Sequence, residues 1–161
     1  MENNIIKQNT IIEIINTLKE KNQTITFAES CTGGRIASAF TAISGASSVL
    51  MGSAVTYANE IKSHWLGVKE QTLLEYGAVS SQCVEEMLSG ILKMASADYA
   101  IAVSGIAGPT GGTQTKPVGT IYIGIETPQK KIVQHHLLQG NRESIQAQAT
   151  DTAIELLKNN L

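Results

Sequence analysis

Strand-like and helix-like segments alternate along this chain of 161 residues, and that alternation most narrows the folds open to it. Short runs rich in β-branched and aromatic residues predict strands at 24–28, 49–57, 99–103, 119–127 and 131–138. Apolar residues at helical spacing predict helices at 3–21, 34–43, 59–66, 71–76, 80–95 and from Asn141 onward. This order predicts an α/β fold, a three-layer α/β/α sandwich with a mixed, mostly parallel five-stranded sheet whose last two strands form a hairpin.

Length and composition place residues 1–161 in a single domain and exclude several classes of partner. A net charge of −2, with no run of Lys or Arg, argues against nucleic acid, as does an aromatic content of 4%. No apolar stretch approaches the roughly 18 residues of a membrane span, and the N-terminus lacks a signal-peptide pattern. Two widely spaced cysteines without a CxxC motif are typical of a protein of the reducing cytoplasm.

The segment 26–34, Thr-Phe-Ala-Glu-Ser-Cys-Thr-Gly-Gly, places Ser30 on a sharp turn between a predicted strand and a predicted helix. The N–H groups of Thr32, Gly33 and Gly34 lie where such a helix starts, and they favour a bound anion there. The alternative is that Ser30 or Thr32 only caps the helix, and the segment taken alone favours capping.

Lys62 follows the next predicted strand, in 56–62, Thr-Tyr-Ala-Asn-Glu-Ile-Lys. Most lysines are solvated surface residues, and that is the alternative here. However, ligands of open α/β sheets bind outside the carboxyl ends of the strands, where Ser30 also lies. A neutral lysine can act as general base for a serine, which requires a pKa several units below its usual value of about 10.4.

A long loop rich in glycine and proline, 104–117, follows the strand predicted to be most buried. Its glycines suit a loop whose backbone N–H groups surround a phosphate, but a simple mobile loop is equally compatible with the spacing. Neither a P-loop nor a dinucleotide-binding GxGxxG motif is present. The candidate binding residues of this region are Ser104, Gly105, Ala107, Gly108, Gly111 and Lys116.

The histidines and cysteines do not form a convincing second site. His64, His135 and His136 lack metal-ligand spacing, so we expect no metal and no cofactor. Cys31 is interpreted as a small buried residue rather than a thiol nucleophile. Glu29 either orients Ser30 or caps the helix, and the sequence leaves both open.

Five motifs in order carry a resemblance to a known family: 28–34, 55–62, 77–80 (Gly-Ala-Val-Ser), 104–109 (Ser-Gly-Ile-Ala-Gly-Pro) and 116–120 (Lys-Pro-Val-Gly-Thr). From about Ile11 onward the chain resembles the C-terminal domain of the CinA (competence/damage-inducible) family, which includes stand-alone nicotinamide-nucleotide amidases. The resemblance implies deamidation of nicotinamide mononucleotide to nicotinate mononucleotide and ammonia. It does not extend to the N-terminal domain of larger members, whose activity is not expected here.

The resemblance also assigns roles: Ser30 as nucleophile, Lys62 as base, Tyr57 beside them, and Arg142, at the start of the last helix, as a basic binding residue. We expect Arg142 or Lys116 to supply charge to the phosphate, and Tyr57 to contact either the pyridine ring or Ser30. Two rivals stay open, a non-catalytic nucleotide-binding module and an amidase or esterase for another small substrate. The expected partners are the small-molecule substrate and a second copy of the chain in a homodimer, the commonest assembly.

Overall fold

The computed structural model describes the backbone of residues 2–161 and the side chains of residues 7–161, and its core is one five-stranded sheet. The described strands are β1 (Ile25–Glu29), β2 (Leu50–Val55), β3 (Tyr99–Gly105), β4 (Thr120–Glu126) and β5 (Lys131–Leu137). The described helices are α1 (Glu2–Glu20), α2 (Arg35–Thr41), α3 (Asn59–Leu66), α4 (Glu70–Tyr76), α5 (Ser81–Ala95) and α6 (Arg142–Lys158), with a 3-10 turn at Ala46–Ser48. Every predicted element is present, with boundaries that differ by one or two residues.

The sheet has the order β2-β1-β3-β4-β5. β1 pairs in parallel with both β2 and β3, whereas the β3–β4 and β4–β5 pairs are antiparallel. The predicted α/β class and the hairpin are therefore confirmed. The expectation of a mostly parallel sheet is slightly overstated, because β4 pairs antiparallel on both of its sides.

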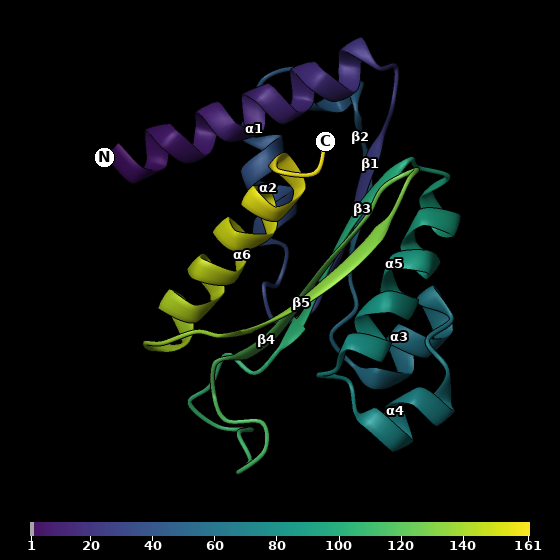
Figure 1. Cartoon of the computed structure of the whole chain (residues 1–161), viewed down its shortest axis with the longest axis vertical. Coiled ribbons are helices and arrows are strands. Elements are labelled where there is room, and N and C mark those ends of the chain that lie inside the picture. The colour runs from purple at the N-terminus through teal and green to yellow at the C-terminus, as the bar shows by residue number, and fades with distance from the viewer. Residues whose placement is uncertain (1) are drawn as a thin grey trace.

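Helices cover both faces of the sheet and complete the three layers (Figure 1). α1, α2 and α6 pack on one face, over a core that includes Phe27 and Phe40, whose ring centroids lie 4.8 Å apart. α3, α4 and α5 lie on the other face, where α5 contributes Val84, Met87 and Leu88 to a second cluster. β3, in the middle of the sheet, is buried along almost its whole length, as its apolar sequence predicts.

Where its side chains are described, α1 has one buried apolar side, as the helical spacing of its apolar residues predicts. Ile11, Ile14, Ile15 and Leu18 are buried, whereas Ile12 is 39% exposed. The side chains of Ile5 and Ile6, which have the same apolar spacing in the sequence, lie outside the described residues.

The sheet order brings three chain segments together at one edge. β1 lies between β2 and β3 and runs parallel to both, so the carboxyl ends of all three strands meet there. Ser30 follows β1, the segment that leads into α3 follows β2, and the glycine-rich loop follows β3. α3 is held close to α5 because Gly90 has no side chain, since a Cβ there would lie 1.9 Å from the carbonyl oxygen of Leu66.

Candidate active site

Ser30 lies in the turn between β1 and α2 and is 8% exposed. Its N–H group donates to the carbonyl oxygen of Val103 in β3 at 3.0 Å, and its own carbonyl accepts from the N–H of Gly33 at 3.0 Å. Gly33 and Gly34 both adopt positive φ angles, of 60° and 94°, which favour glycine at these two positions. The turn that carries the Ser30 hydroxyl is therefore fixed by the sheet on one side and by its own hydrogen bond on the other.

Lys62, in the second turn of α3, reaches Ser30 from the opposite layer. Its Nζ lies 3.1 Å from Ser30 Oγ, 2.7 Å from the carbonyl oxygen of Thr56 and 3.1 Å from that of Tyr57. Both carbonyl oxygens can only accept hydrogen bonds, so a neutral amine gives them its two N–H groups. The remaining lone pair of the nitrogen then faces the Ser30 hydroxyl, which is the arrangement that a general base needs.

The surroundings of Lys62 favour its neutral form. The side chain is 1% exposed, and burial lowers its pKa below the ordinary value of 10.5 because a charged amine loses its hydration there. None of the ion pairs among the described side chains involves Lys62. A buried amine without a counter-charge beside a hydroxyl is a strong candidate for a reactive pair.

The two thiols near this pair are not competing nucleophiles. Burial raises the pKa of Cys31 to about 12 and that of Cys83 to about 11, so both remain protonated near neutral pH. Both are free and buried, and Cys31 is 4% exposed, as expected for a small packing residue.

Glu29, whose role the sequence leaves open, is fully buried and caps α2. Its Oε2 accepts hydrogen bonds from the Thr32 hydroxyl at 2.7 Å, from the N–H of Gly34 at 3.0 Å and from the N–H of Ile36 at 3.1 Å. Its Oε1 accepts from the N–H of Ala37 at 2.9 Å. The start of α2 is thus already occupied by an anion that belongs to the chain itself.

This cap changes which N–H groups of the turn remain available for a ligand. The N–H of Gly33 is bonded to Ser30 and that of Gly34 to Glu29, so two of the three predicted donors are already used. Within the described residues, the N–H groups of Cys31 and Thr32 make no hydrogen bond to another residue. Thr32 is fully buried, whereas Cys31, directly after Ser30, lines the cavity, so the Cys31 amide is the one that remains for a ligand.

A cavity of about 310 Å³ opens beside Ser30 and Lys62. Most of the predicted site residues line it together: Ser30, Tyr57, Lys62, Ser104, Gly105, Ala107, Gly108, Gly111 and Arg142. The cavity is also lined by residues without a predicted role: Asn59, Ala78, Val79, Ile106 and Thr110. Of these, Ala78 and Val79 belong to the motif 77–80, and the Ser104 hydroxyl donates to the Ala78 carbonyl oxygen at 2.8 Å.

Four predicted binding residues do not line this cavity: Thr32, Gly33, Gly34 and Lys116. The Thr32 hydroxyl is directed to Glu29. Lys116 does not line the cavity, and its Nζ donates to the carbonyl oxygen of Tyr76 at 2.6 Å. This contact joins the end of the glycine-rich loop to the last residue of α4.

Arg142, the first residue of α6, spans the mouth of the cavity. Its guanidinium donates to the Gly108 carbonyl oxygen at 2.7 Å and to the Tyr57 hydroxyl at 2.9 Å. No carboxylate among the described side chains forms an ion pair with it, so its charge is not neutralised by the chain. Arg142 and Lys62 are the two basic residues that line the cavity, and no acidic residue lines it.

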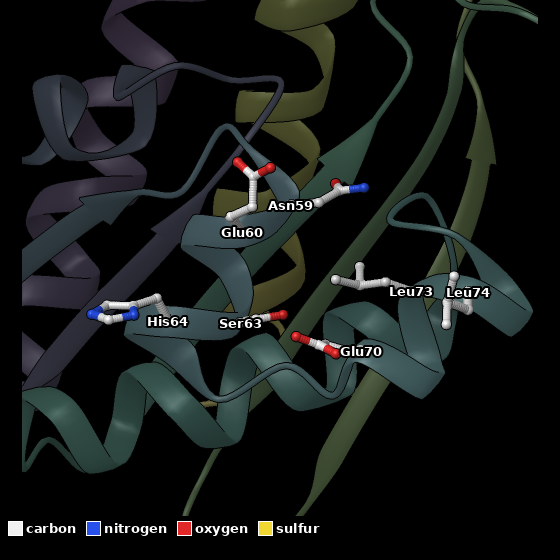
Figure 2. Close-up of a pocket in the computed structure, with 7 residues that line it drawn as sticks. All are labelled: Asn59, Glu60, Ser63, His64, Glu70, Leu73 and Leu74. Carbon is white, nitrogen blue, oxygen red and sulfur yellow. The ribbon is translucent and has the colours of Figure 1, made fainter.

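A second cavity, of about 560 Å³, lies between α3 and α4 (Figure 2). Figure 2 shows Asn59, Glu60, Ser63 and His64 along α3, with Glu70, Leu73 and Leu74 along α4. Its two carboxylates would repel a phosphate, and it lacks a nucleophile paired with a base. The chemistry of the Ser30 cavity therefore marks that cavity as the candidate active site.

The described residues contain neither a metal-binding cluster nor a membrane-spanning helix. Within residues 7–161, no group of three or more His, Cys, Asp or Glu side chains is placed to hold a metal ion. In the same part of the chain, no helix has the length and apolar character needed to cross a bilayer.

Comparison with known proteins assigns the sequence to a family. The family described as "CinA C-terminal domain" matches residues 7–161. A CinA-like protein of Thermotoga neapolitana is 46% identical over 92% of this chain, but the chain spans only 36% of that relative. The nicotinamide-nucleotide amidohydrolase PncC of Escherichia coli K12 is 45% identical, over 87% of this chain and 86% of the relative.

Solved structures agree with the sequence matches. A competence damage-inducible protein A from Klebsiella pneumoniae superposes with a TM-score of 0.91 and 36% identity, over 95% of each chain. A competence/damage inducible protein from Agrobacterium tumefaciens gives a TM-score of 0.91 and 37% identity, over 94% of this chain and 93% of that one.

Proposed function

This chain belongs to the family of the CinA C-terminal domain, and we propose that it is an amidase that converts nicotinamide mononucleotide to nicotinate mononucleotide and ammonia. One observation carries the proposal: Lys62 Nζ lies 3.1 Å from Ser30 Oγ, in a cavity whose lining also includes the guanidinium of Arg142, which has no carboxylate partner among the described residues. The PncC relative, which covers most of this chain, supplies the substrate.

The first half of the reaction forms an acyl-enzyme. Ser30 Oγ attacks the carboxamide carbon while its proton passes to the neutral Lys62 amine. The carbonyl oxygen becomes an oxyanion, which is stabilised by the N–H group of Cys31, the amide directly after the nucleophile. The protonated Lys62 then gives its proton to the amide nitrogen, the C–N bond breaks, and ammonia leaves.

The second half reverses these steps with water. Lys62, neutral again, takes a proton from a water molecule whose oxygen attacks the acyl carbon. When the tetrahedral intermediate collapses, Ser30 Oγ leaves and recovers a proton from Lys62. The product is a pyridine carboxylate, and Ser30 and Lys62 return to their starting forms.

The rest of the cavity holds the nucleotide. The glycine-rich loop contributes its backbone to the ribose and phosphate, and Arg142 contributes a guanidinium that has three N–H groups beyond the two bonded to Gly108 and Tyr57. Tyr57, 60% exposed at the mouth, covers the pyridine ring. Lys116 is not proposed as a phosphate ligand, because its amine faces Tyr76.

The two buried free thiols also support a reducing compartment, so we place the reaction in the cytoplasm. Residues 1–161 act as one amidase domain in this proposal. Assembly as a homodimer stays a prediction.

The test is ammonia release from nicotinamide mononucleotide, in the presence of a chelator, by the wild type and by Ser30→Ala. We expect release by the wild type and none above background by the variant, at an unchanged melting temperature. Nicotinamide riboside, which lacks the phosphate, is expected to be a poor substrate. A wild type that releases no ammonia, but is stabilised by the mononucleotide, would favour the non-catalytic binding module. Near-normal turnover by Ser30→Ala would show that another group is the nucleophile.

A further inference from the structure

Glu29 is more completely engaged than a helix cap requires. An ordinary capping side chain satisfies one or two N–H groups at the start of a helix. Glu29 instead reaches from the last residue of β1 and accepts four hydrogen bonds, from Thr32, Gly34, Ile36 and Ala37. With 0% exposure, the carboxylate has no water to replace any of these partners.

The residues that Glu29 holds surround the nucleophile. Residues 30–33 form the turn between Glu29 and its partners, and within it Ser30 is bonded to Val103 of β3 and to Gly33. The Thr32 hydroxyl and the Gly34 N–H, both bonded to Oε2, fix the far end of the turn. The positions of Ser30 Oγ and of the Cys31 N–H group therefore depend on where the carboxylate lies.

We infer that Glu29 is a positioning residue of the enzyme, whose buried carboxylate holds the turn 30–33 so that Ser30 Oγ stays within reach of Lys62 and the amide of Cys31 faces the oxyanion. Glu29 does not line the cavity and does not touch the substrate. The inference rests on the proposed function, and it deepens it by naming what orients the nucleophile.

A purely structural cap and a positioning residue predict different kinetics. Loss of a cap alone lowers the melting temperature but leaves the folded fraction fully active. Loss of a positioning residue displaces the nucleophile, and a displacement of about 1 Å can lower the rate by roughly 100-fold. Substrate binding by Arg142 and the glycine-rich loop would be unaffected, so the loss falls on kcat and not on KM.

The experiment compares Glu29→Gln with Glu126→Gln. Glutamine keeps the shape of the side chain, but its NH₂ group cannot accept, so at least one N–H of the turn or of α2 loses its partner. Glu126 is a matched control, because it also ends a strand and its carboxylate pairs with Lys131 at 3.1 Å, away from the cavity. For each protein we would measure kcat, KM, the melting temperature and the rate at which a fluorophosphonate labels Ser30.

For Glu29→Gln we expect kcat and the labelling rate to fall together by about 10- to 100-fold, with KM within about threefold of the wild type. Glu126→Gln should keep both rates within about twofold. If Glu29→Gln melts earlier but keeps kcat and the labelling rate within twofold, Glu29 is only a cap and the inference is overturned. If Glu29→Gln does not fold, Thr32→Val, which removes one of the four contacts, decides by the same two rates.

The labelling arm separates this inference from the proposed function. A wild type that is labelled but releases no ammonia contradicts the proposed substrate, while the labelling rates of the variants still decide the role of Glu29. A wild type that is not labelled at all overturns both, because Ser30 is then not an activated nucleophile.

Discussion

Glu29, the last residue of β1, and Lys62, in the helix that follows the neighbouring strand β2, are two buried ionisable side chains with opposite surroundings. Glu29 is 0% exposed and accepts four hydrogen bonds, so its negative charge is fully satisfied. Lys62 is 1% exposed and contacts two carbonyl oxygens and one hydroxyl, with no carboxylate paired to it among the described residues. A buried amine without a counter-charge readily gives up its proton and can act as a base.

The change expected to have the largest effect removes the amine. Lys62→Met should lower kcat/KM by about 1000-fold or more, because no other group is placed to take the Ser30 proton. The free energy of unfolding should change by less than about 1 kcal/mol, since burying an apolar side chain in place of a desolvated amine offsets the lost hydrogen bonds. Ammonia release and urea unfolding measure the two quantities.

Lys69→Met is the matched control. Lys69 is exposed and lies just after the same helix, and among the described residues it forms one ion pair, with Glu86 at 3.8 Å. It should keep activity within about twofold. Substantial activity in Lys62→Met would break the comparison, because Lys62 would then be a structural lysine.

The second prediction concerns pH. Because burial lowers the pKa of Lys62 below 10.5, kcat/KM should rise about tenfold per pH unit up to an apparent pKa below that value, and then level off. Stability should follow the same group. Between the lowered pKa and 10.5 the unfolded chain binds more protons than the folded one, so the free energy of unfolding rises with pH in that window.

The difference between the wild type and Lys62→Met isolates this contribution, because the variant lacks the group. Urea unfolding of both proteins across the window, together with kcat/KM of the wild type, provides the measurements. A wild-type curve that runs parallel to that of the variant, or an activity limb centred at or above 10.5, would contradict a neutral Lys62.

The sequence identified both residues of the reactive pair, but not the main-chain groups that orient Lys62. Ser30 and Lys62 follow neighbouring strands whose carboxyl ends meet, so their proximity could be argued from the topology and from the family resemblance. The carbonyl oxygens of Thr56 and Tyr57 that orient Lys62 could not be predicted, because main-chain acceptors have no sequence signature.

Glu29 and Lys116 show where local reasoning stops. The spacing of Glu29 before the helix allowed either of its two roles, and only the folded turn shows that its carboxylate reaches Thr32, Gly34, Ile36 and Ala37. Lys116 was a reasonable phosphate ligand because it follows the glycines in sequence. The path of that loop instead brings its amine to Tyr76, a contact between residues 40 positions apart.

The smallest effect we predict sharpens the comparison with a third charge, Arg142. Its guanidinium, like Lys62, has no carboxylate partner among the described residues, but it lies at the mouth and keeps its charge. Arg142→Lys keeps the charge and loses the planar fork, so KM for the mononucleotide should rise about tenfold, near 1.4 kcal/mol, with kcat little changed. Steady-state kinetics of ammonia release give both constants.

Lys116→Met is the control for Arg142→Lys, and it should change KM by less than about twofold, because the amine of Lys116 faces Tyr76. With nicotinamide riboside the two variants should behave alike, since the phosphate that Arg142 holds is missing. A larger rise in KM for Lys116→Met than for Arg142→Lys would show that the phosphate binds near Lys116, at the other end of the glycine-rich loop. The carboxamide would then have to approach Ser30 from the side of Ala78 and Val79. In that case Arg142 would not be the phosphate ligand, and the contrast between a neutral Lys62 and a charged Arg142 would not explain substrate binding.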